Sequence, residues 1–99
     1  MTDTANTATI ATGLAALDLY SEHLEAAMGS AGEISNILEL RYLFAISGLQ
    51  SQDFVLFSVA EIIRKILGWP DKRLGKLDRP ALQQAAADLT RCLETALCA

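Results

Sequence analysis

Residues 34–67 read ISNILELRYLFAISGLQSQDFVLFSVAEIIRKIL, and this stretch decides the fold. Its apolar side chains recur at spacings of three and four residues, which is the pattern of helices, whereas strands alternate. We predict one helix that ends near Ser47 and another over residues 52–67, separated by a short turn at residues 48–50. Because the turn is so short, the two helices are expected to form an antiparallel hairpin.

Both helices of this expected hairpin are apolar on nearly every side. The later half of the first has few polar residues, and the polar stripe of the second is confined to Ser58, Glu61, Arg64 and Lys65. A helix with so little polar surface has to be covered from several directions. A chain of 99 residues has few other helices to cover it. The sequence therefore predicts a homodimer in which two copies share this hairpin through an isologous contact.

Two more helices are expected outside the hairpin. Apolar residues recur at helical spacing from Ile10 to Met28 and stop at Gly29, and a last helix begins near Pro80. Gly13 is the one glycine that no turn or helix end explains, and it weakens the start of the first helix. These boundaries predict four helices in all.

The composition agrees with a helical fold. The chain holds sixteen alanines and sixteen leucines but only nine isoleucines and valines together, a balance that favours helices over sheets. We predict an all-α fold, in which residues 10–99 form a single domain with the architecture of a compact antiparallel four-helix bundle. The polar residues 1–9 show no periodicity and are expected to form a flexible tail.

Charge is distributed unevenly along the chain. Residues 1–53 hold one basic and seven acidic residues, whereas six of the eight basic residues lie between Arg64 and Arg79. This segment suits an acidic protein surface, including the acidic first helix of a second copy. The alternative is a regulator that binds nucleic acid through Arg64 to Arg79. Asp71, Asp78 and the net charge of −4 count against a nucleic-acid partner.

Catalytic and metal-binding patterns are missing from the sequence. His23 is the only histidine, and it lacks the Glu-x-x-His spacing of helical di-metal sites. Cys92 falls in an apolar stripe and has no nucleophile motif around it. The glycines do not form a phosphate-binding loop. We therefore expect no enzymatic activity, no metal, no cofactor and no small-molecule substrate.

A cytoplasmic location is expected. The sequence has no apolar run of eighteen residues and no signal peptide. On one helix, Cys92 and Cys98 would lie about 9 Å apart along the axis and point to different sides, so they do not pair with each other. Free thiols suit a reducing compartment.

What remains is a function in binding. We expect a small bacterial-type protein-binding module, an adaptor, chaperone or antiactivator-type regulator, that holds a protein partner in an apolar groove rimmed by charge. The expected anchors are the large aromatic residues and two leucines of a charged loop over residues 71–79, with two cations beside them. These candidate partner-binding residues are Phe54, Phe57, Trp69, Leu74, Leu77, Lys72 and Arg73. For Trp69 the simpler interpretation is that it covers the end of the third helix.

Overall fold

Helices account for nearly all of the chain that the structure describes. The structure is a computed structural model, and it describes residues 3–29, 31–47 and 53–98. Over these ranges there are five α-helices and no strand, which confirms the all-α prediction. The helices are α1 (Asp3–Met28), α2 (Ala31–Ser47), α3 (Asp53–Leu67), α4 (Asp71–Leu74) and α5 (Arg79–Cys98).

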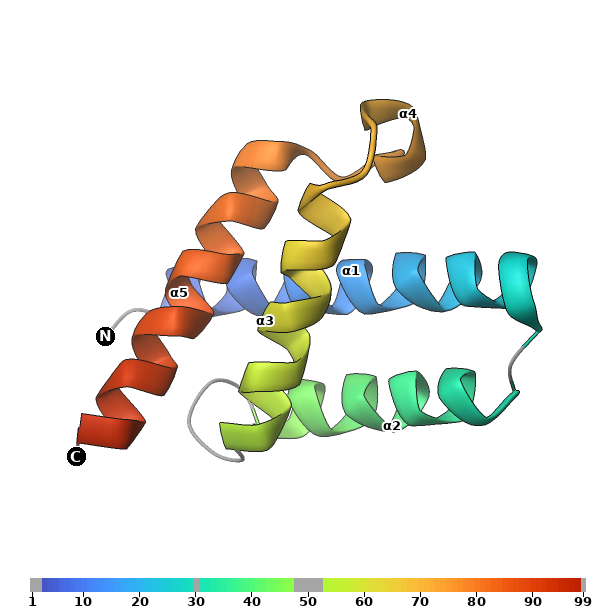
Figure 1. Cartoon of the computed structure of the whole chain (residues 1–99). Coiled ribbons are helices and arrows are strands. Elements are labelled where there is room, and N and C mark those ends of the chain that lie inside the picture. Colours follow the sequence, from blue (N-terminus) through green and yellow to red (C-terminus); the bar gives the residue numbers. More distant parts are fainter. Residues whose placement is uncertain (1–2, 30, 48–52, 99) are drawn as a thin grey trace.

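The first two helices, α1 and α2, form an antiparallel hairpin (Figure 1). As expected, α1 stops at Gly29, whose positive φ of 59° gives the left-handed end that a side chain would oppose. Gly13 lies against the ring of Phe44 on α2, because a Cβ atom there would clash with Cε2 of Phe44. The glycine that the sequence left unexplained is therefore a contact point between α1 and α2.

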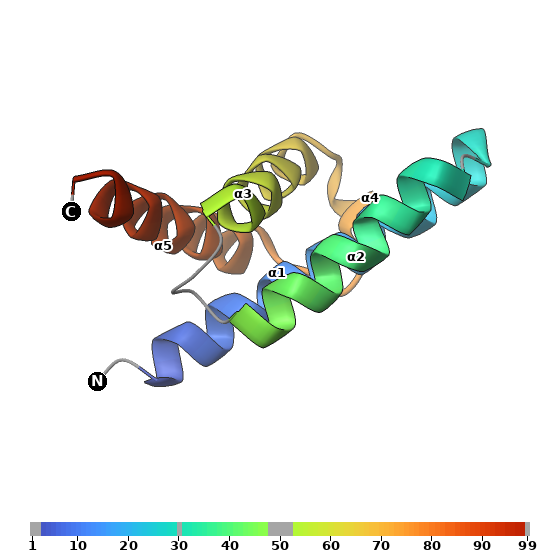
Figure 2. The ribbon, with the colours of Figure 1, turned by 90° about the horizontal axis from the view of Figure 1, so that it is seen from below.

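The second hairpin consists of α3 and α5, and it lies across the first in a separate layer (Figures 1 and 2). The predicted bundle of four antiparallel helices is not confirmed, and neither is the predicted pairing of α2 with α3. The closest packing is between α3 and α5 and between α1 and α2. The turn expected at residues 48–50 lies outside the described residues. In this two-layer packing, α1 and α5 together cover most of α3, and α2 contacts it less.

The core lies between these two layers. Leu17 of α1, Phe44 of α2 and Leu82 of α5 are fully buried in it. Helix α3 contributes the largest share, as its apolar character predicted. Its buried residues are Val55, Leu56, Val59, Ala60, Ile62, Ile63 and Ile66.

Two segments that were expected to lack structure are helical. Residues 1–9 were expected to form a flexible tail. In the structure α1 begins at Asp3, and Thr9 is only 3% exposed. Thr9 lies against α5, because its hydroxyl donates a hydrogen bond to Asp88. The expected charged loop contains α4, one helical turn that follows Pro70 and buries Leu74 to 3% exposure. An apolar residue in a charged segment thus belongs to the core.

The connection from α3 to α5 is fixed by Arg79. Its guanidinium donates hydrogen bonds to the carbonyl oxygens of Leu67 and Trp69 and forms an ion pair of 3.0 Å with Asp71. Free carbonyls at the end of a helix need such donors. The next helix is capped by Asp78, whose carboxylate accepts the backbone N–H of Ala81 at 2.8 Å. These contacts fix the position of Trp69 in the connection between α3 and α5.

Candidate functional site

The seven predicted partner-binding residues do not share one surface. Phe54 and Phe57 lie in the first turn of α3, whereas Trp69 and the residues after it follow the last turn. At 1.5 Å per residue, roughly 20 Å of helix separates the two groups. The expected groove is therefore divided into two regions at opposite ends of α3.

The exposure of the predicted residues also differs. Phe54 and Phe57 are exposed, as are Lys72 and Arg73. The expected anchor Leu74 is buried, and this part of the prediction is wrong, because the turn of α4 points it into the core. The remaining two are half-buried and pack against the core, namely Trp69 and Leu77.

Large apolar side chains are exposed on α2 as well as on α3. We call the set the apolar face, and its exposed fractions run from 53% to 71%. The sequence prediction missed its α2 members, although their spacing of four residues places them on one side of the helix. The residues of the apolar face are Leu38, Tyr42, Ile46, Phe54 and Phe57.

The apolar face is open because α2 lies at the margin of the fold. It packs against α1 and, to a smaller extent, α3 (Figure 2). Only Ile37 and Phe44 of α2 are buried. An ion pair of 2.7 Å between Arg41 and Asp18 connects α2 to α1 next to Tyr42 of the apolar face. Exposed apolar patches of this kind mark interaction surfaces.

A second surface combines aromatic rings with cations. The Tyr20 and Trp69 rings are stacked, with centroids 6.3 Å apart, and the His23 ring lies 4.7 Å from that of Trp69. Lys65 Nζ is 5.8 Å from the centroid of Tyr20, and Arg73 Cζ is 5.4 Å from that of Trp69. We call these five residues the aromatic–basic patch. It joins α1, α3 and α4 at the end of α3 remote from Phe54.

Some of the basic segment is already engaged within the chain. Arg64 pairs with Glu61 at 2.8 Å and also donates to Thr90, and Arg79 is held at the end of α3. In the part of the chain that the structure describes, the other four basic residues of the segment are exposed and make no ion pair. They are Lys65, Lys72, Arg73 and Lys76.

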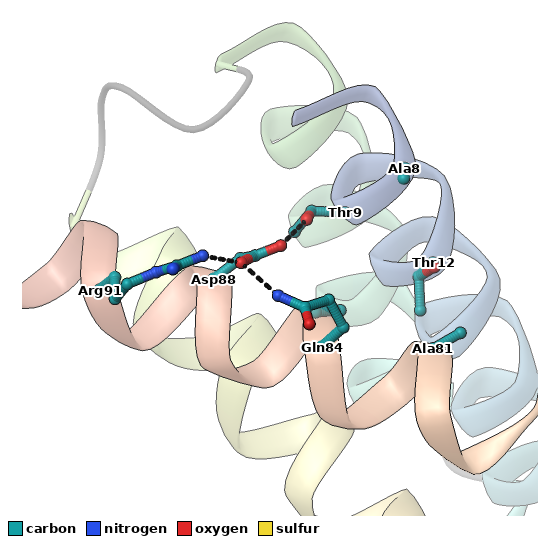
Figure 3. Close-up of a pocket in the computed structure, with 8 residues that line it drawn as sticks. Ala8, Thr9, Thr12, Ala81, Gln84, Asp88 and Arg91 are labelled. Atoms are coloured by element: carbon teal, nitrogen blue, oxygen red, sulfur yellow. Dashed lines mark hydrogen bonds and ion pairs between the residues drawn. The ribbon is translucent and has the colours of Figure 1, made fainter. Parts of the chain in front are cut away.

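Among the described residues, a buried polar network joins the start of α1 to the middle of α5, beside a pocket of about 270 Å³ (Figure 3). Asp88 accepts hydrogen bonds from Thr9 at 2.6 Å, from Gln84 at 2.9 Å and from Arg91. The pocket is smaller than most ligand sites, and the carboxylate that lines it already has three donors. This network fastens the start of α1 to α5.

Acid is expected to weaken this fastening. Burial disfavours the Asp88 carboxylate, but the hydrogen bonds from Thr9, Gln84 and Arg91 and the Arg91 charge outweigh it and hold the pKa below the ordinary 3.8. The ionised carboxylate therefore stabilises the fold above about pH 4, and this contribution is lost as the pH falls from 3.8 through the lower folded-state pKa.

Asp88→Asn is expected to lower the free energy of unfolding by about 1 kcal/mol at pH 7, and to make it depend less on pH below 4. Urea unfolding at pH 7 and pH 3 measures both effects. Glu94→Gln is the matched control, because Glu94 is exposed on the same helix and should change neither. An Asp88→Asn protein with native stability at pH 7 would show that the network does not stabilise the contact between α1 and α5.

The residues that were considered for catalysis are not brought together. His23 packs against Trp69, and Cys92 lies on α5. Burial and the charge of Asp88 raise the pKa of the Cys92 thiol, which disfavours the reactive thiolate. Among the described residues, no three His, Cys, Asp or Glu side chains are placed to hold a metal ion.

Comparison with known proteins adds no further assignment. No protein-family model, no curated protein and no solved structure matches this chain. None of the helices, as far as the structure describes them, is long and apolar enough to cross a membrane. The apolar face and the aromatic–basic patch are therefore the features from which a function is inferred.

Proposed function

We propose that this chain is a non-catalytic protein-binding module that works as a homodimer, an adaptor or antiactivator-type regulator in which the apolar face joins two copies. One observation carries the proposal: among the residues whose burial the structure describes, the exposed large apolar side chains are all on α2 and α3. The sequence singled out the same two helices as more apolar than the rest of the chain can cover.

The size of the apolar face supports a self-association role. At 53–71% exposure, five side chains of this size leave roughly 600 Å² of their surface open, against about 800 Å² that each partner buries in a standard interface. Neighbouring atoms such as those of Ala45, which is also exposed, add to this area. The summed area of these side chains is close to what each partner of a stable dimer buries.

The stripe on α2 suits a two-fold symmetric contact. Leu38 and Ile46 each lie four residues from Tyr42, so two antiparallel copies of α2 that cross at Tyr42 place Leu38 of one beside Ile46 of the other. Each copy contributes one charge beside the stripe, Glu39, because Arg41 is engaged by Asp18 and Glu33 lies in the first turn. The two Glu39 side chains then sit about 9 Å apart along the helix, which limits their repulsion.

A charge placed at the centre of the stripe tests this proposal. Tyr42→Glu puts two carboxylates at the symmetry axis, and it should weaken the dimer at least about a hundredfold. Tyr42 is 63% exposed, so the fold of each copy should be kept. Sedimentation equilibrium measures the dissociation constant, and circular dichroism checks the helix content.

The matched control is Gln83→Glu, which adds the same charge to an exposed position of α5. It should leave the dissociation constant within about threefold of the native value. Equal weakening by both substitutions would mean that net charge governs association rather than the stripe. A Tyr42→Glu protein that associates like the native chain would refute the assignment of α2.

A further inference from the structure

We infer that the aromatic–basic patch binds an acidic segment of a partner protein, with carboxylates as the groups that it recognises. The inference rests on the proposed function, because it names the partner chemistry of the same module. The patch lies at the opposite end of α3 from Phe54 and Phe57, and none of its residues belongs to the apolar face.

The cations of the patch are held in place before a partner arrives. Lys65 lies over Tyr20 and Arg73 over Trp69, while these two rings stack on each other. A cation that rests on an aromatic ring loses less side-chain freedom when it forms an ion pair. A stacked guanidinium still offers N–H donors at its edge, which fit the two oxygens of a carboxylate.

The segment around the patch carries a net positive charge, with six basic and two acidic residues over residues 64–79. The two acidic residues interleaved with the basic ones have partners inside the chain. Asp71 forms an ion pair with Arg79, and Asp78 accepts the backbone N–H of Ala81. Lys72 and Lys76 are exposed in the same segment without an ion pair among the described residues. Together with Lys65 and Arg73 of the patch, they make four exposed cations in residues 65–76, and an acidic segment is complementary to this surface.

A protein segment fits this surface better than a nucleic acid. Proteins that bind nucleic acid commonly contact six to ten phosphates, about twice the number of free cations here. The acidic half of the chain, residues 1–53, would repel an extended polyanion. The Tyr20 ring, on which a base would stack, is already in contact with both Lys65 and Trp69. A short acidic peptide has to meet only the patch.

The test uses a fluorescein-labelled nonapeptide with six glutamates as the probe. Fluorescence anisotropy measures its affinity for the full chain at low salt, and unlabelled peptide should shift the emission of Trp69, the only tryptophan. Arg73→Ala should weaken binding about tenfold. Lys76→Ala is the matched control: it removes the same charge from the same segment without a ring contact, and should weaken binding less than threefold.

Two further arms separate the possible outcomes. A thymidine oligonucleotide of equal charge should bind at least tenfold more weakly than the peptide, and equal or tighter binding would overturn the inference in favour of nucleic acid. Equal losses in Arg73→Ala and Lys76→Ala, or no binding of the peptide, would also overturn it. The Tyr42→Glu protein should bind the peptide like the native chain, so a failure of the dimer and a failure of the patch are distinguishable.

Discussion

Replacing Gly13 with alanine is expected to lower the free energy of unfolding by about 2–3 kcal/mol. Alanine is the better helix former by about 1 kcal/mol, so helix propensity alone predicts the opposite sign. The new Cβ atom, however, would be 2.4 Å from Cε2 and 2.9 Å from Cζ of Phe44. Phe44 is fully buried, so its ring has no free space into which to move. Urea unfolding at one fixed protein concentration measures the change.

Gly32→Ala is the control for this prediction. Gly32 lies in the first turn of α2, and a Cβ atom there would meet nothing within 4 Å. This substitution should leave the stability unchanged or raise it by up to about 1 kcal/mol. Combining Gly13→Ala with Phe44→Leu should recover part of the loss from Gly13→Ala, since leucine is smaller than phenylalanine. A Gly13→Ala protein as stable as the native chain would contradict the close packing of α1 on α2.

Replacing Arg79 with alanine is expected to lower the free energy of unfolding by about 2 kcal/mol. The substitution removes the donors from the carbonyl oxygens of Leu67 and Trp69 and leaves the Asp71 carboxylate without its cation. Because these contacts join the end of α3 to the start of α5, the emission of Trp69 should also shift toward that of an exposed indole. Urea unfolding gives the stability, and the emission spectrum of the folded protein reports the local change.

Arg79→Lys distinguishes the geometry of these contacts from the charge. Lysine keeps the cation but has no planar fork that reaches two carbonyls and a carboxylate at once. It should recover less than half of the loss. Full recovery by lysine would show that Arg79 acts as a charge, as expected if it belonged to a binding surface rather than to the link between α3 and α5.

Local signals predicted where the helices end. Gly29 stops α1, and the predicted ends at Ser47 and Leu67 coincide with those of α2 and α3. Such stops depend on residues next to the boundary, which the sequence displays directly. The one-turn helix α4 was missed, because four residues are too few for a periodic pattern.

The pairing of the helices depends on contacts between distant residues, and the predicted pairing is not confirmed. A short connection favoured an α2–α3 hairpin, whereas the structure pairs α1 with α2 and α3 with α5. The contact of Gly13 with Phe44 gives the reason for the first pair. In the sequence the same glycine was only a weak point in a helix, because its partner is 31 positions away.

The candidate sites were predicted in part. The aromatic residues Phe54 and Phe57 are exposed as expected, but the residues of the stripe around Tyr42 were not among the named candidates. A helix that is apolar on all sides does not reveal which side its neighbours cover. Trp69 and Arg73 were expected at a partner site, and that remains a proposal. The contact of Trp69 with Tyr20 and His23 joins distant segments, and charge counting along the chain gives no sign of it.

The central claim is that the apolar face of α2 and α3 joins two copies of the chain. Light scattering coupled to size-exclusion chromatography, run from about 1 µM to about 100 µM, measures the solution mass. We predict twice the chain mass of 10.7 kDa at the higher concentrations, with dissociation on dilution. A mass of 10.7 kDa at every concentration would contradict the claim, because the apolar face would then stay uncovered by a second copy.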